Sequence, residues 1–146
     1  MHLDKYQTKS GEQNQVFEFV SIGPKGRIPK LVQYLPTNYK NLYNLGFGDK
    51  LLSGDFDDKV ISNNGDSEKV LATVVSTIYN FTDKNPEALV HIKSSTESRT
   101  RLYRIGITKY LDEVRKHFDI FGKTENGWED FEPNTNYSAF LVKRKI

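Results

Sequence analysis

Strand-like patterns stand at both ends of this chain, and between them two helix-like patterns enclose one further strand-like pattern. This order of patterns restricts the fold more than any other feature of the sequence. Helices enclosed by strand-rich ends are typical of a single sheet that carries its helices on one face. With 146 residues, the chain has the length of one ordinary domain that can bury its own hydrophobic core.

The first strand-rich end predicts a β-hairpin. Residues 16–22 and 27–36 are rich in β-branched and aromatic side chains, and a Gly-Pro-Lys-Gly turn lies between them. Pro29 has no backbone N–H to donate to a strand ladder, so it indicates an edge strand or a bulge. Residues 41–49 predict a third strand, and the short apolar run at residues 60–63 is a candidate for a fourth.

The first helical pattern begins after Asp66 or Ser67, either of which can act as an N-cap. Apolar side chains then recur at helical spacing as far as Phe81 and predict one apolar face. The helix should end before Pro86, because proline cannot continue it. Residues 88–93 then predict another strand.

The second helix starts within the sequence KSSTESRTRLYR, at residues 93–104. Ser94 and Glu97 have the spacing of a capping box, in which each side chain bonds to the other residue's backbone N–H. Ser95 or Thr96 could cap the helix instead. The segment therefore predicts a helix N-terminus that is rich in hydroxyl groups and followed by arginines.

A core-facing stripe follows along this second helix. Tyr103, Ile107, Tyr110 and Val114 recur at the spacing of one helical face. Gly106 lies within the stripe and lowers helix propensity. Ile105 points away from the stripe, so either it meets another element or the helix kinks near Gly106.

The second strand-rich end predicts another hairpin. Residues 117–123 form a strand pattern, and Asn126-Gly127 is a favoured two-residue hairpin turn. Residues 136–146 predict a final strand with a basic end. Together the elements predict an α+β fold, a two-layer sandwich with a mostly antiparallel sheet of five to six strands and two helices on one face.

The middle of the chain, strand–helix–strand, could be a crossover between two parallel strands. We expect residues 1–15 to be a polar N-terminal segment that is at most partly ordered. We expect residues 16–146 to form a single α+β domain.

Composition excludes several classes of protein. The chain has no cysteine, which excludes disulfides, a thiolate nucleophile and Cys-ligated zinc. The formal net charge of +2 excludes a strongly basic nucleic-acid binder but permits a local basic patch. The polar N-terminus has no apolar signal region, and no apolar run is long enough to span a bilayer. We therefore expect a cytoplasmic protein without a membrane partner.

Both predicted helices start directly after a strand, and helix N-termini offer unpaired N–H groups and a partial positive charge to anions. If the preceding strands are parallel, both N-termini lie at one end of the sheet, where open sheets bind ligands. The alternative is two capped helix starts whose charged side chains are solvated or paired with Asp or Glu. The predicted ligand-binding residues are Asn64, Asp66, Lys69, Ser95, Thr96, Arg99 and Arg101.

Other chemical motifs are weak. The acidic loop around Asp55, Asp57 and Asp58 lacks the glycine and glutamate that continue a calcium-binding EF-hand. The three histidines have no ligand spacing, and no phosphate loop or nucleophile elbow is present. The sequence therefore predicts no metal and no cofactor, and the catalytic residues, if there are any, are unknown.

Five segments resemble, as a set, an uncharacterised family of small single-domain bacterial proteins, a domain of unknown function. They read FEFVSIGPKGRIPKLVQY, YNLGFGD, ISNNGDSEKVLATVVSTIYNF, SSTESRTRLYRIGI and NYSAFLVKRK. The resemblance extends from about Val16 to Lys145. It implies a stand-alone bacterial protein but no activity, cofactor or catalytic residue.

The sequence leaves three functional hypotheses. The first is a binding module with an anion site at the helix N-termini, whose ligand is a phosphate-bearing or carboxylate-bearing small molecule or nucleic acid. The second is an enzyme acting on a phosphorylated or nucleic-acid substrate, with Asp66 or His91 as its general base. The third is a protein-interaction domain, such as a homodimer or a toxin–antitoxin component, that uses the hairpin edge at residues 24–36 and the basic C-terminal strand.

Overall fold

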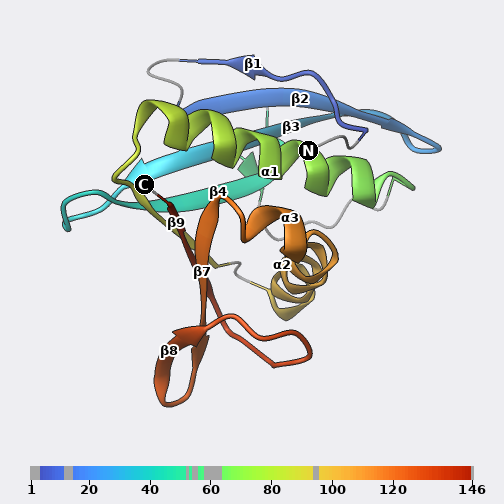
Figure 1. Cartoon of the computed structure of the whole chain (residues 1–146). Coiled ribbons are helices and arrows are strands. Elements are labelled where there is room, and N and C mark those ends of the chain that lie inside the picture. The colour runs from blue at the N-terminus through green and yellow to red at the C-terminus, as the bar shows by residue number, and fades with distance from the viewer. Residues whose placement is uncertain are drawn as a thin grey trace.

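A computed structural model shows two layers, a sheet and a set of helices packed against one of its faces (Figure 1). The predicted α+β class and the mostly antiparallel sheet are confirmed. The structure describes residues 4–11, 15–51, 53, 56–57, 64–93 and 96–145. The predicted strand at residues 60–63 lies outside these ranges.

The sheet is larger than predicted. In the described residues, eight strands follow one another in the order β1-β2-β3-β4-β6-β9-β7-β8, and the two-residue β5 pairs with β4 beside them. The prediction of five to six strands was wrong because the shortest strands form through pairing with a neighbour and have no periodicity of their own. The strands are β1 (Lys9–Ser10), β2 (Val16–Gly23), β3 (Gly26–Pro36), β4 (Leu42–Lys50), β5 (Phe56–Asp57), β6 (Leu89–Ile92), β7 (Phe118–Thr124), β8 (Gly127–Asp130) and β9 (Phe140–Arg144).

The two predicted helices are present, and one short helix adds to them in the part of the chain that is described. They are α1 (Ser67–Lys84), α2 (Glu97–Lys109) and the single turn α3 (Leu111–Val114). α2 runs through Gly106 as far as Lys109, and the helical stripe breaks at Tyr110. Ile105 is exposed on its surface. A Cβ on Gly106 would lie 3.1 Å from Leu71 Cδ1, so the glycine lets α2 approach α1 closely.

The N-terminal hairpin is confirmed, with Gly23 paired to Gly26 across its turn. Pro29 lies within β3, which is an internal strand between β2 and β4. The β3–β4 register begins at Lys30, one residue after the proline. Pro29 is therefore at a local edge of the ladder, which explains how an internal strand tolerates a residue without an N–H.

The crossover in the middle of the chain is also present. β4 precedes α1 and β6 follows it in the sequence, and the two strands pair in parallel. The C-terminal strand is shorter than predicted, and β9 covers Phe140–Arg144. Residues 136–139 form a loop that still bonds to β7, with Ser138 N donating to Lys123 O at 3.1 Å and Lys123 N donating to Ala139 O at 3.0 Å.

The core lies between the helices and the sheet. Phe81 of α1 stacks on Tyr34 of β3 with ring centres 4.2 Å apart, and Tyr43 of β4 meets the edge of the same ring. Figure 1 shows α1 crossing in front of β2, β3 and β4, with α2 and α3 beside the strands β7 and β9. The hairpin β7–β8 extends past the helices (Figure 1).

Candidate functional site

Asn64, the first predicted site residue, is buried, and its side-chain amide forms hydrogen bonds within the fold. Its amide nitrogen donates to Ser21 Oγ at 3.1 Å and to the carbonyl oxygen of Gly26 at 3.0 Å. Its amide oxygen accepts from the backbone N–H of Lys25 at 2.7 Å. These bonds attach the start of α1 to the β2–β3 turn, so they are structural.

Asp66 occupies the N-cap position of α1, but its side chain makes no capping hydrogen bond. Its Oδ2 instead accepts from Tyr6 Oη and from Ser21 Oγ, each at 2.5 Å. Lys69 lies on the same side, with Nζ 4.3 Å from the Tyr6 ring centre and 3.9 Å from the Asp4 carboxylate. This group therefore fastens the N-terminal segment to the fold.

Thr96 caps α2, because its Oγ1 accepts the backbone N–H of Arg99 at 3.3 Å. This confirms one of the alternative caps proposed from the sequence. Ser94 and Ser95 lie outside the described residues.

Arg99 is buried, with only 3 % of its surface exposed. Its Nη1 donates to the carbonyl oxygen of Phe47 at 2.9 Å, and its guanidinium carbon lies 4.9 Å from the Phe47 ring centre. Cation–π contact and a charge-assisted hydrogen bond both stabilise this position. The contacts give Arg99 a structural role in joining α2 to β4.

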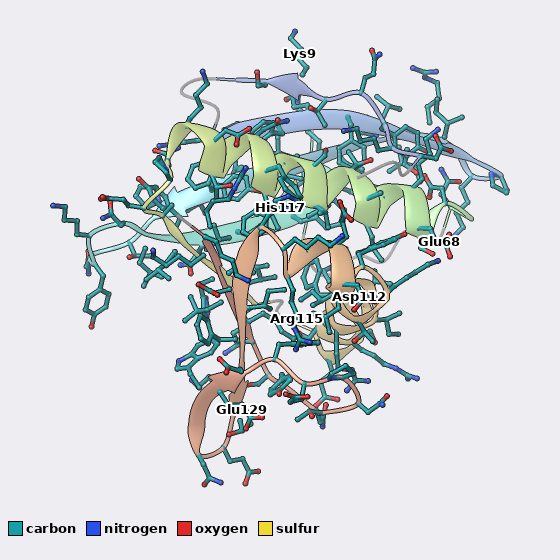
Figure 2. All side chains as sticks on the ribbon, in the orientation of Figure 1. Lys9, Glu68, Asp112, Arg115, His117 and Glu129 are labelled. Atoms are coloured by element: carbon teal, nitrogen blue, oxygen red, sulfur yellow. The ribbon has the colours of Figure 1, made fainter. Side chains whose placement is uncertain are left out.

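The two helix N-termini do not share one cleft. The C-terminal end of α2 lies at the start of α1, where Lys109 pairs with Glu68. Figure 2 shows Glu68 at the end of α1 nearest α2. Since α2 has 13 residues, its N-terminus lies about 18 Å from this contact. The predicted residues are thus divided between two places, Asn64, Asp66 and Lys69 at one and Thr96 and Arg101 at the other.

A hollow of about 660 Å³ opens beside the N-terminal half of α2. We call it the α2 hollow. The opposite wall comes from the end of β7 and from the loop that precedes β9. Its lining consists of Lys93, Thr96, Glu97, Thr100, Arg101, Arg104, Lys123, Thr124, Glu125, Asn136, Tyr137 and Ser138.

The α2 hollow is basic. Four of its lining side chains, Lys93, Arg101, Arg104 and Lys123, are cationic, whereas only Glu97 and Glu125 are acidic. In the described part of the chain none of these cations forms an ion pair. Arg104 Nη1 instead donates to Asn136 Oδ1 at 3.2 Å. The lining thus places a local positive charge on a chain whose total charge is small.

Tyr137 holds the loop side of the hollow. Its ring packs against Gly122, where an added Cβ would lie 2.4 Å from the nearest ring atom. Its hydroxyl donates to Glu129 Oε2 at 2.9 Å and accepts from Glu132 N at 3.0 Å. Figure 2 shows Glu129 on the β7–β8 hairpin. The loop that carries Asn136 and Ser138 is therefore fastened to the hairpin.

Residues 2–145 match the profile of DUF6934, a family of unknown function. The chain belongs to this family. Comparisons with curated proteins and with solved structures find no match. The family match confirms the resemblance stated from the sequence, and it attaches no activity to the α2 hollow.

Sequence reasoning missed several lining residues of this DUF6934 protein. Lys93 and Arg104 lie within or beside the segment that was singled out, but Lys123, Asn136 and Ser138 come from distant segments. No local pattern marks them, because the tertiary fold alone brings the β7 end and the β9 loop to α2.

The candidate general bases of the DUF6934 protein do not meet. Asp66 contacts Tyr6 and Ser21, while His91 bonds to Asn44 at 3.0 Å and lies 5.9 Å from Trp128, centre to centre. Among the side chains that the structure describes, no group of three His, Asp or Glu residues could hold a metal ion. No helix in the described ranges is both long and apolar enough to cross a membrane.

Proposed function

We propose that this DUF6934 protein is a binding module that holds an anionic ligand in the α2 hollow. One observation carries the proposal: Lys93, Arg101, Arg104 and Lys123 line one hollow and form no ion pairs within the described residues. Like charges that share one hollow repel each other, and an anion placed between them relieves that repulsion.

The chemistry of the lining favours phosphate. Arg101 and Arg104 lie three residues apart on α2, so their side chains project from neighbouring positions on its surface. A guanidinium presents several N–H donors in a planar fork that matches phosphate or carboxylate oxygens. Ser138 and Asn136 add neutral donors on the opposite wall. Because four cations exceed what one carboxylate needs, we infer a phosphate-bearing ligand.

The acidic side chains restrict where the anion lies. Glu97 is in the first turn of α2, and Glu125 follows the end of β7. Each would repel a phosphate placed next to it. The ligand's charge is therefore expected near Arg101 and Arg104, and a neutral part of the ligand is expected near the glutamates.

Isothermal titration with pyrophosphate, together with thermal unfolding, tests the proposal. The test variant is Arg101→Ala/Arg104→Ala. The matched control is Arg27→Ala/Lys40→Ala, which removes the same charge from exposed positions outside the hollow. At a hundred times the dissociation constant, the ligand should add about 2.7 kcal/mol of stability to the wild type and the control.

We expect the test variant to bind at least tenfold more weakly than the control. Equal affinity in the two variants, or no saturable binding by the wild type, would show that the α2 hollow is not an anion site.

A further inference from the structure

The sheet has a second surface of interest on the face that the helices do not cover. Val90 and Ile92 of β6 are buried beneath the helices, so His91 between them projects from the opposite face. In register with His91 lies Leu141 of β9, and in register with Leu141 lies Phe121 of β7. Residues in register share a face. All three are partly exposed.

Trp128 of β8 completes this surface. It pairs with Lys123 of β7, which projects from the same face as Phe121 two residues earlier. Trp128 is 42 % exposed, and its indole meets the His91 ring edge to face, with ring centres 5.9 Å apart. We call His91, Phe121, Trp128 and Leu141 the outer platform.

Two lysines connect the outer platform to the α2 hollow. Lys123 is the cross-strand partner of Trp128 and also lines the hollow. Lys93 follows His91 by two residues and lines the hollow as well. Burial lowers the pKa of His91, and the positive charges of these two lysines lower it further. The ring is therefore neutral at pH 7. At this end of the sheet, Lys93 and Lys123 thus belong to the α2 hollow and lie next to residues of the outer platform.

We propose that the ligand is single-stranded nucleic acid, with phosphates in the α2 hollow and bases stacked on the outer platform. This rests on the proposed function, since it assigns a ligand class to the same anion site. Exposed rings beside a basic groove are the combination that single-stranded nucleic acid requires. A free phosphate or a short carboxylate would use the cations but not Trp128.

The arrangement favours a single strand over a duplex. Bases in a duplex are already stacked on each other, whereas a single strand can place its bases on protein rings. Asp130 of β8 pairs with Phe121 of β7. It therefore lies on the edge strand, away from β6 and β9. Its charge repels phosphate there, so the backbone of the strand is expected at the edge formed by Lys93 and Lys123.

The chain's only tryptophan gives a direct measurement, since Trp128 is the single Trp in the sequence. Intrinsic fluorescence is followed while a twelve-nucleotide single strand, DNA or RNA, is added, and anisotropy of the labelled strand is measured in parallel. We expect saturable quenching by at least one of the two strands, and affinity that falls as salt increases. A duplex of the same sequence should bind at least fivefold more weakly.

Trp128→Ala should weaken binding of the single strand by at least about fivefold, the lower end of one base–aromatic stack. Trp128→Phe should restore most of it, because phenylalanine keeps a stacking ring. Tyr39→Ala is the matched control, since Tyr39 is an exposed aromatic residue in the β3–β4 turn. Pyrophosphate binding should be the same in all these variants, which also shows that each is folded.

The outcomes separate this inference from the proposed function. Pyrophosphate binding without quenching by either strand overturns the nucleic-acid ligand and leaves the anion site. Strand binding that Trp128→Ala does not change, or duplex binding of equal strength, overturns the outer platform. If neither pyrophosphate nor any strand binds, both proposals are wrong.

Discussion

Arg99 Nη1 donates a 2.9 Å hydrogen bond to the carbonyl oxygen of Phe47, and the Arg99 guanidinium lies against the Phe47 ring. The contact joins the first turn of α2 to β4. Arg101, two residues further along α2, is exposed and lines the α2 hollow. Neighbouring arginines of one helix therefore have different surroundings, and their substitution should have different effects.

Arg99→Ala should lower the free energy of unfolding by about 1.5–3 kcal/mol, because it removes a buried hydrogen bond from a charged donor and empties its place in the core. Arg101→Ala is the matched control and should change stability by no more than about 0.5 kcal/mol. Urea denaturation of both variants checks this. Equal losses in the two variants would contradict the structural role of Arg99.

Asp66→Ala should lower the free energy of unfolding by about 1–3 kcal/mol, because the hydroxyls of Tyr6 and Ser21 both donate to its carboxylate. Tyr6→Phe removes one of the two donors. In the double variant the losses should not add, and we expect a coupling energy of about 0.5–3 kcal/mol from a double-mutant cycle. Simple additivity would mean that Asp66 does not hold the N-terminal segment through Tyr6.

Tyr34 should make the protein sensitive to alkali. Burial raises the pKa of Tyr34, and its hydroxyl lies 2.7 Å from Thr77 Oγ1. In the unfolded chain the phenol ionises near pH 10, while the folded protein keeps it protonated. The unfolded state therefore loses its proton first. The contribution of Tyr34 to stability is complete below pH 10 and is lost as the pH rises above that value.

Urea denaturation of wild type and Tyr34→Phe between pH 8 and pH 11 measures this contribution. At pH 8 the variant should be less stable by about 1 kcal/mol, the usual value of one hydrogen bond. Above pH 10 the wild type should lose its advantage and then become the less stable of the two. A difference that stays constant over the whole range would contradict the prediction.

The α2 hollow shows how far sequence reasoning reached. The hydroxyl-rich start of α2 was recognised, and Thr96 and Arg101 do line the hollow. The partners on its other wall could not be predicted, because Lys123 and Asn136 belong to segments with ordinary strand and loop patterns. Asn64 and Asp66 were grouped with the start of α2 because both helices follow strands. In the structure the C-terminal end of α2, and not its start, lies beside the start of α1, where Lys109 pairs with Glu68.

The sequence by itself determined the type and order of the main elements. The Gly-Pro-Lys-Gly turn, the apolar stripe of α1 and the hydroxyl-rich cap region of α2 are local signals that act within a few residues. The second hairpin was predicted at the right place but one residue off, because Thr124 pairs with Gly127 and the turn residues are Glu125 and Asn126. Only the tertiary structure decided the direction of α2 and the surroundings of each charged side chain. Burial of apolar surface is not directional, so an apolar stripe shows that a helix packs on the sheet but not in which direction. The direction depends on contacts between residues far apart in the sequence, such as Gly106 against Leu71 and Arg99 against Phe47. With α2 in this direction Arg99 is buried and Arg101 is exposed at the hollow.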